Sequence, residues 1–366
     1  MSAVRAVDLE DTEGLLAADR DGLLRAASSA GAQARAVAAA VDEGALEAVR
    51  TDDRPRSLIW VAGRGTAETA GAMVAATVGG TASEPIVQTA EVPPWIGPLD
   101  VLIVAGDDPG DPALVAAAAT GARRGARVVV VAPYEGPLRD STAGRAAVLA
   151  PRLAIPDEFG LCRYLAAGLA VVQIVDQRPS IDLRALADEL DAEALRNSAG
   201  RELFTNPAKT IAARIADRQV ALAGDCAATL ALARHGSSVL LRIAHQVVGA
   251  TGLSDAVVAL RAGIAGGFPD PADALFHDEQ IDGPLPRRLL VLALTLSAEQ
   301  SVVAARTAGL DDVYLLAAED VPDGPGGSAG STVAPALGGA ISAEQQLAVL
   351  AVRLEMAAVY ARLVRG

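Results

Sequence analysis

The stretch from Leu58 to Val131 limits the possible folds more than any other part of the chain. Three apolar runs lie in it, and each of the first two is followed by a turn and a helix-like stretch; the runs span residues 58–62, 100–106 and 125–131. Buried strands that alternate with helices are typical of a parallel sheet. The sequence therefore predicts an α/β fold with a doubly wound sheet in this region.

The length and composition indicate two domains. A chain of 366 residues is long for one core, and 51% of its residues are hydrophobic while only 3% are aromatic. The strand–turn–helix plan recurs after residue 205, with apolar runs at 219–224, 288–294 and 312–316. We predict N-terminal helices over 1–50, a first domain over 51–177, a connecting helix over 178–204 and a second domain over 205–366.

The charge balance excludes some classes of partner. The net charge is -14, from 31 basic and 45 acidic residues, whereas nucleic acids and anionic membranes select basic surfaces. Three histidines and two distant cysteines, Cys162 and Cys226, give no spacing typical of a metal site. We find neither an apolar signal core nor a membrane-spanning run. We expect a cytoplasmic protein without a metal or cofactor, and without nucleic-acid or membrane partners.

Local signals predict several further elements. Helical spacing continues over residues 8–50, and later segments are a strand at 147–150, an apolar helix at 159–175, separate helices at 227–236 and 237–250, and a Gly/Pro/Ser-rich loop at 319–339. Asn206 followed by Pro207 marks a helix start. Ser342 and Gln345 form the pattern of a capping box before a C-terminal helix to Leu363.

Several fragments, in order, resemble the bacterial bifunctional phosphoglucose/phosphomannose isomerase family, whose chains carry two sugar isomerase (SIS) domains. The fragments are Gly63-Arg64-Gly65-Thr66-Ala67 with Gly71, the strand from Asp100, residues 123–128, Asn206-Pro207-Ala208-Lys209 and residues 356–360. The resemblance covers nearly the whole chain. It implies two SIS-type domains, each a mostly parallel sheet in a flavodoxin-like three-layer arrangement, a homodimer, and a phosphorylated sugar or related metabolite as ligand.

The same comparison shows departures at positions where the family performs catalysis. A phosphosugar isomerase needs N–H groups and hydroxyls for the phosphate and a carboxylate that moves a proton between two sugar carbons. The family's Ser-Gly-Asn-Thr loop aligns with Asp107-Asp108-Pro109-Gly110, and a carboxylate at ~5 Å from a phosphate costs on the order of 3 kcal/mol. The position of the family's catalytic Glu holds Gly249, its downstream His has no counterpart in 252–267, and its terminal Lys-bearing helix would follow Gly366.

These positions give a set of candidate ligand-binding residues and leave the catalytic residues unknown. The set contains the turn glycines and threonine, the end of the second strand, and three residues that could meet an anion or move a proton: Gly63, Gly65, Thr66, Gly106, Asp107, Asp108, Arg163, Arg242 and His245. Each has a structural alternative. The glycines can serve packing, the loop acids, with Asp111, can cap a helix or bind a cation, and His245 can be a rim or core histidine.

Three functions follow from these alternatives. The first, which we favour, is a catalytically degenerate, regulatory binder of a sugar phosphate or related metabolite. The second is an active aldose–ketose isomerase in which Thr66 and Arg163 bind the phosphate and His245 or a nearby acid transfers the proton. The third is a scaffolding dimer. Residues 276–279, Phe-His-Asp-Glu, are interpreted as a polar loop, and Cys226 as a buried, unreactive thiol.

Overall fold

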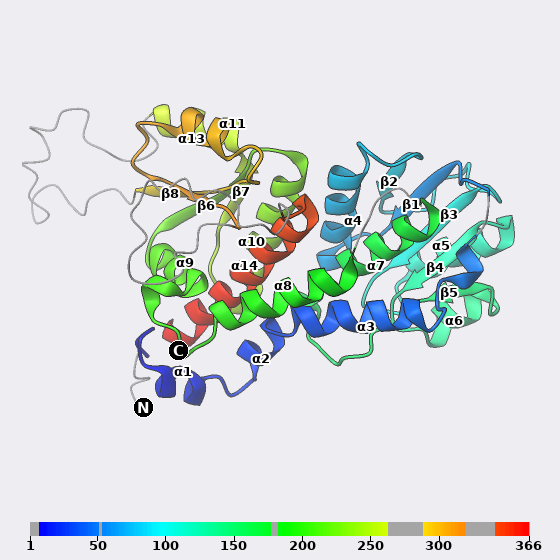
Figure 1. Ribbon diagram of the computed structural model, residues 1–366, viewed down its shortest axis with the longest axis horizontal. Helices are drawn as coiled ribbons and strands as arrows, with labels where there is room; N and C mark the ends of the chain where they lie inside the picture. The colour runs from blue at the N-terminus through cyan, green and yellow to red at the C-terminus, as the bar shows by residue number, and fades with distance from the viewer. Residues whose placement is uncertain (1–6, 51–52, 177–181, 263–287, 319–340, 366) are drawn as a thin grey trace, which may run out of the picture.

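The structure is a computed structural model that describes residues 7–50, 53–176, 182–262, 288–318 and 341–365. It contains two parallel sheets, one in each half of the chain, with helices on both faces (Figure 1). The first sheet has the strand order β2-β1-β3-β4-β5 and the second has the order β7-β6-β8-β9. The predicted α/β class is therefore confirmed. The predicted domain limits stay a prediction.

The first sheet contains one strand that the sequence did not reveal. Its strands are β1 (Ser57–Val61), β2 (Ile86–Thr89), β3 (Asp100–Ala105), β4 (Arg127–Val131) and β5 (Ala146–Val148). The sequence did not predict β2. This strand has only four residues, all half-buried, and shows no continuous apolar run. The strand expected at 147–150 is therefore the fifth of the sheet and begins one residue earlier.

The helices of the first half form a layer on each face of the sheet. Alternate strand residues such as Ile59 and Leu102 pack with α5 and α6, while Trp60 and Ile103 pack with α3, α4 and α7. The helices of this half are α1 (Thr12–Ala18), α2 (Leu23–Ala27), α3 (Ala30–Asp42), η1 (Glu47–Val49), α4 (Gly65–Val78), α5 (Pro112–Arg124), α6 (Gly136–Thr142), η2 (Asp157–Phe159) and α7 (Leu161–Val175).

The second half repeats this plan. Its elements are α8 (Leu183–Arg196), η3 (Leu203–Thr205), α9 (Pro207–Ile215), β6 (Gln219–Gly224), α10 (Ala227–Ala244), β7 (Gly249–Gly252), α11 (Leu253–Arg261), β8 (Leu289–Leu294), α13 (Gln300–Thr307), β9 (Val313–Leu316) and α14 (Ala343–Arg365). Leu222 and Leu292 face α10 and α14, and Ala223 and Val291 face α11.

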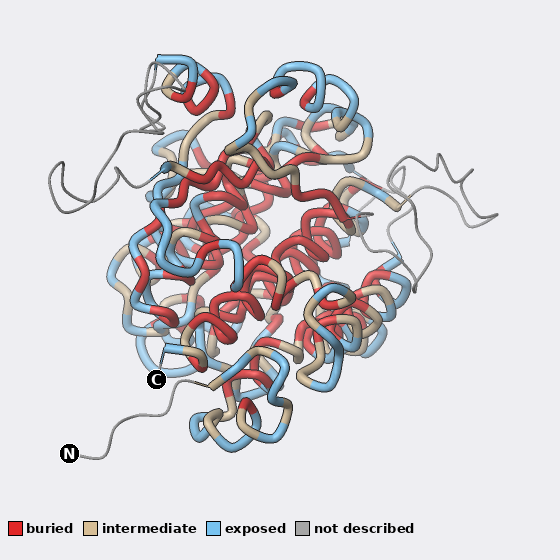
Figure 2. Tube along the Cα trace, turned by 90° about the vertical axis from the view of Figure 1, so that its left-hand side faces the viewer, coloured by how far each residue is buried: buried red, intermediate tan, exposed pale blue. Residues whose placement is uncertain are grey.

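The two halves share one interior. Helix α4 of the first half packs against α10 of the second, and α14 runs between the two sheets (Figure 1). Figure 2 shows the buried residues, in red, concentrated in the interior of the molecule, with exposed residues, in pale blue, around them. Buried Arg353 of α14 joins Glu193 of α8, with 2.6 Å from its Nε to Oε1. No helix among the described residues has the length and apolarity needed to cross a membrane.

Two expectations for the second half were tested directly. The separate helices predicted at 227–236 and 237–250 were wrong, because α10 runs unbroken through Gly236 and residues 249–252 form β7. Gly236 lies where a Cβ would be 2.7 Å from Leu222 Cδ1, so this glycine permits close packing rather than ending the helix. The capping box is confirmed: the Ser342 N–H donates to Gln345 Oε1 and the Gln345 N–H to Ser342 Oγ.

Some expectations lie outside the described residues. They are the loop at 319–339, the polar loop at 276–279, and residues 263–267 of the segment 252–267 in which a downstream histidine was sought.

Candidate functional site at the edge of the first sheet

The carboxyl ends of the first sheet form the edge where the predicted site residues gather. The chain leaves β1 toward β2 on one side and then reaches β3 on the other, so the strand order reverses between β1 and β3. Open α/β sheets bind ligands at such a reversal, outside the carboxyl ends of the strands. Two adjoining cavities lie here, and they share Asp107 and Asp157 as lining residues.

The first cavity, which we call the crevice, has a volume of about 290 Å³ and lies between the turns that follow β1 and β3. Helix α10 of the second half contributes to its wall. Six predicted site residues line it: Gly63, Gly65, Gly106, Asp107, Asp108 and Arg242. Arg64, Asp111 and Asp157 also line it. The crevice is therefore acidic, with four carboxylates and two guanidinium groups among its lining residues.

The N-terminus of α5, which follows β3, is occupied by the chain's own carboxylates. Asp111 is the N-cap residue and accepts from the Ala113 N–H at 2.8 Å. Asp108 accepts from the Gly110 N–H at 2.8 Å, and Pro112 has no N–H to offer. A phosphate at this helix end would have to displace a carboxylate and remain beside it. Of the three loop acids for which a capping role was proposed, Asp111 caps the helix, whereas Asp108 accepts from Gly110, which precedes the helix, and Asp107 contacts Arg163 instead.

The N-terminus of α4, which follows β1, is different. Within the described residues no side chain caps it, and Gly65 begins the helix with a φ of 68°. Arg64 is 75% exposed, and its guanidinium lies 3.9 Å from Asp108 and from Asp111. The uncapped N–H groups at the start of α4 and the exposed guanidinium of Arg64 can therefore contact a ligand anion in the crevice. The Thr66 hydroxyl does not face the crevice: Thr66 is buried and donates to the Asp157 carbonyl at 3.1 Å.

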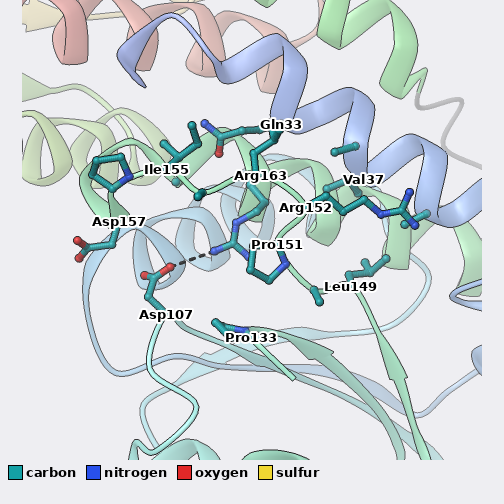
Figure 3. Close-up of a pocket in the computed structure, with 17 residues that line it drawn as sticks. Gln33, Val37, Asp107, Pro133, Leu149, Pro151, Arg152, Ile155, Asp157 and Arg163 are labelled. Carbon is teal, nitrogen blue, oxygen red and sulfur yellow. Dashed lines mark hydrogen bonds and ion pairs between the residues drawn. The ribbon is translucent and has the colours of Figure 1, made fainter. Parts of the chain in front are cut away.

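The second cavity, which we call the Arg163 pocket, has a volume of about 220 Å³ (Figure 3). It lies beneath α3, beyond the carboxyl ends of β4 and β5. Its walls are mostly apolar, from Val37, Pro133, Leu149, Pro151 and Ile155 among others. Figure 3 shows the Arg163 guanidinium inside the cavity, while the Arg152 guanidinium points away from it.

Arg163 and Asp107 form the polar centre of this pocket. Arg163 Nη2 donates to Asp107 Oδ1 at 3.0 Å, and the Tyr164 hydroxyl donates to the same oxygen at 2.6 Å. The guanidinium stacks on the Tyr164 ring, 4.0 Å from its centroid. Partial burial raises the pKa of Asp107, although Tyr164 and Arg163 oppose this effect. Arg163 Nη1 is buried and has no hydrogen-bond partner among the described residues.

The second half of the chain positions one wall of both cavities. Arg242 of α10 contacts both carboxylate oxygens of Asp157 at 3.0 Å and Glu158 Oε1 at 2.7 Å. Glu158 and Asp157 belong to η2, which directly precedes α7 and Arg163. Arg242 therefore acts on the site by fixing η2, a role that the sequence did not suggest.

The remaining candidates lie elsewhere. His245 is the exposed C-cap residue of α10, with a φ of 52°, and lines neither cavity. Its expected position within the helix was wrong, because the helix ends at Ala244. Cys226 is half-buried at the N-cap of α10, where its N–H donates to the Thr229 hydroxyl at 3.1 Å. Among the described residues, no three His, Cys, Asp or Glu side chains gather as metal ligands.

Two polar features of the structure were not singled out from the sequence: Asp157, and the buried pair of His235 and Glu355. Asp157 borders both cavities, and its only signal is that it follows Pro156 just before an apolar helix. His235 of α10 and Glu355 of α14 form a buried pair, with 2.9 Å between Nε2 and Oε1. Burial raises the pKa of Glu355, and its Oε2 has no partner within the described chain. This pair borders neither cavity.

Solved structures share this fold. The Escherichia coli tagatose-6-phosphate ketose/aldose isomerase is 15% identical, with 96% of this chain and 92% of that chain covered and a TM-score of 0.58. A glucose-6-phosphate isomerase-like protein from Thermus thermophilus is 18% identical, with 98% and 96% covered and a TM-score of 0.55. The C-terminal domain of the Francisella tularensis glucosamine-fructose-6-phosphate aminotransferase is 10% identical, with 94% and 97% covered and a TM-score of 0.57.

These similarities agree with the observed fold of two parallel sheets flanked by helices, and identities this low show the fold alone. The assignment of the two halves as SIS-type domains stays a prediction. No protein-family model matches the sequence, and no curated protein matches it. The narrower phosphoglucose/phosphomannose isomerase family stays a prediction.

Proposed function

We propose that this protein binds a phosphorylated sugar or a related small metabolite at the edge of the first sheet and acts by binding rather than by isomerisation. The observation that carries the proposal is the crevice itself, an open polar cavity at the reversal of strand order. Proteins that share the fold act on sugar phosphates, and the crevice of this chain has the size and polar lining that such ligands need.

The phosphate of the ligand is expected at the N-terminus of α4. Gly65, which begins this helix, and Arg64 line the crevice there, and the contacts of Arg64 with Asp108 and Asp111, at 3.9 Å, are weak enough to exchange. The alternative position at α5 is filled by Asp111 and Asp108, and Pro112 removes a further donor. The ligand therefore lies in the crevice with its phosphate toward β1.

The lack of isomerisation is proposed because the crevice carboxylates are engaged. Aldose–ketose transfer needs a carboxylate free to take a proton from a sugar carbon. Asp157 is paired with Arg242, and Asp107 is held by Arg163 and Tyr164. Each of these carboxylates would have to leave its guanidinium partner before it could reach a sugar carbon. A binding protein of this kind would regulate, by reporting the concentration of its ligand.

An active isomerase is the second candidate, and one observation favours it. Asp107 borders both cavities, and partial burial raises its pKa. A raised pKa brings a carboxyl group closer to the value that suits a general base near neutral pH. In this alternative Asp107 moves the proton, and His245 has no part.

A binding panel tests the proposal. Thermal unfolding is measured with glucose, mannose, fructose and glucosamine 6-phosphates and with the same sugars without phosphate. A ligand at a hundredfold excess over its Kd adds about 2.7 kcal/mol of stability. Arg64→Gln should weaken binding of the phosphorylated sugars only. Arg123→Gln is the matched control, because this exposed arginine lies in the last turn of α5, at the opposite edge of the sheet.

Activity assays with the same phosphates separate the two candidates. Stabilisation without turnover supports the binding role, and turnover lost in Asp107→Asn supports the isomerase. The absence of any stabilisation across the panel would refute both. The homodimer stays a prediction, which light scattering during size-exclusion chromatography tests.

A further inference from the structure

The Arg163 pocket is lined by a side chain with a hydrogen-bond donor that has no partner among the described residues. Arg163 is only 9% exposed, yet its Nη1 has no partner among the described residues, while Nη2 is paired with Asp107. Nη1 carries two N–H donors. A buried donor without an acceptor is costly and uncommon, and the side chain that carries this one lines a cavity (Figure 3). An acceptor group of a ligand would satisfy it.

We propose that the Arg163 pocket is a binding site, separate from the crevice, for a small organic carboxylate with a short apolar body. The carboxylate accepts from Arg163 Nη1, and the body contacts the apolar wall formed by α3 and the strand ends. The inference goes beyond the proposed function, because it concerns the second cavity and a ligand of another class.

The charge of Asp107 selects a monoanion. Asp107 already balances the charge of Arg163, so an incoming anion meets a carboxylate on the same guanidinium. A doubly charged phosphate would meet twice the repulsion of a carboxylate. Among the described residues that line the pocket, the other cation is Arg152, and both of its Nη atoms are engaged by Glu43.

The walls select an apolar body. Val37, Leu149, Pro151 and Ile155 line the cavity, and such side chains give no partner to the hydroxyls of a sugar. A carbon chain of a few atoms would bury its surface against them. The crevice, with its four carboxylates, favours a ligand rich in hydroxyls instead, so the two adjoining cavities are suited to different chemistry.

The protonation state of Asp107 should control the affinity. The charged and titratable groups facing Asp107 are Arg163 and Tyr164 of α7, Asp157 of η2 and Arg242 of α10. When Asp107 takes up a proton, the repulsion disappears and Arg163 is released toward the ligand. The raised pKa of Asp107 agrees with this, since less acid is then needed to protonate it. Carboxylate affinity should therefore rise as the pH falls toward the pKa of Asp107, for as long as the ligand itself stays ionised.

Ligand-observed NMR titration with sodium butyrate, its uncharged isostere butyramide, and inorganic phosphate tests the proposal on the full chain. Butyrate should bind at least about tenfold more tightly than butyramide or phosphate. Asp107→Asn, which removes the opposing charge and keeps the shape, should tighten butyrate binding about tenfold and abolish its pH dependence. Arg163→Gln should remove butyrate binding, and Arg123→Gln should leave it unchanged.

Three results would overturn the proposal. They are equal affinity for butyrate and butyramide, no gain of affinity in Asp107→Asn, and butyrate binding that survives Arg163→Gln. Because Arg163 is buried, its variant could fold poorly. The gain expected in Asp107→Asn does not depend on that variant and decides the matter alone. Failure of the sugar-phosphate panel would leave this test untouched, since the two ligands occupy different cavities.

Discussion

The two sheets end in turns of the same kind that differ in what surrounds them. In the first half, the turn after β1 contains Gly63, and a Cβ added there would meet no atom within 4 Å. In the second half, β6 ends at Gly224, directly before the turn, and a Cβ there would lie 2.2 Å from the backbone nitrogen of Leu230. One glycine leaves room beside a cavity, and the other lets helix α10 press onto its strand.

The acids beside these turns differ in the same way. Asp225, after β6, accepts from the Thr229 hydroxyl at 2.8 Å and closes the turn. Asp107, after β3, borders two cavities and contacts an arginine that itself faces one of them. The similar folds of the two halves therefore do not reveal which half binds a ligand. The open space around the turn residues of the first half indicates that the ligand site lies there.

The largest expected effect comes from paired glycine substitutions. Gly224→Ala should destabilise the protein by about 3 kcal/mol, because the methyl group meets backbone that cannot move aside. Gly63→Ala should change the free energy of unfolding by less than about 0.5 kcal/mol, since it enters open space. Urea denaturation of both variants measures this.

If Gly63→Ala and Gly224→Ala lost similar amounts of stability, the proposed difference in the space around the two glycines would be wrong. It would be sharpened if Gly63→Ala kept its stability and lost affinity for the crevice ligand, because the added methyl group lies beside the proposed phosphate position.

A second, smaller effect concerns two side chains, Arg163 and Glu355, that each have a buried atom without a partner among the described residues. Arg163 lines a cavity, whereas Glu355 lines neither cavity. Burial raises the pKa of Glu355 in the folded state. Its contribution to stability is thus present below the unfolded pKa and is lost as the pH rises through the folded one. Glu355→Gln removes this loss, so relative to the wild type it should gain about 1 kcal/mol between pH 5 and pH 8.

Urea denaturation at the two pH values checks this gain, and ligand titration checks that affinity is unchanged. A Glu355→Gln variant with a flat stability difference and altered affinity would mean that the buried pair belongs to the site. Asp107→Asn is the matched variant of the first half, and it should alter affinity rather than this pH slope.

The smallest effect concerns the link between the halves. Arg242→Gln releases η2 from α10 and should weaken the crevice ligand about fivefold, or about 1 kcal/mol. Exposed Arg234 on the same helix gives the control, Arg234→Gln, which should bind as the wild type does. Exchange of the pair, as Arg242→Glu with Glu158→Arg, should restore part of the affinity. If Arg242→Gln and Arg234→Gln behave alike, η2 does not depend on α10.

The strands that the sequence predicted are those with continuous apolar runs. β1 and β8 are buried along nearly their whole length and therefore have few polar residues. β2 and β7 were missed because each has four residues and no apolar run; Gly249–Gly252 contains two glycines and a threonine. Gly236 was interpreted as a helix break, since only the tertiary contact with Leu222 reveals why a glycine lies there.

The candidate site was predicted in part for a related reason. Residues of the turns after β1 and β3 were found through the family resemblance, and they lie at one edge of the sheet because parallel strands bring such turns together. Arg242 was found through the family resemblance, but the sequence could not show that it contacts η2. The Arg163 pocket depends on how α3 and residues 149–160 fold over the sheet edge, which no local pattern encodes.

Hydrogen exchange with and without the strongest ligand of the sugar-phosphate panel tests the central claim most directly. If the first half binds, exchange should slow in residues 63–67, 105–111 and 151–163, and remain unchanged in residues 224–229 and 294–297. Slowing confined to the turn after β6 and the end of β8 would place the ligand in the second half and contradict the account.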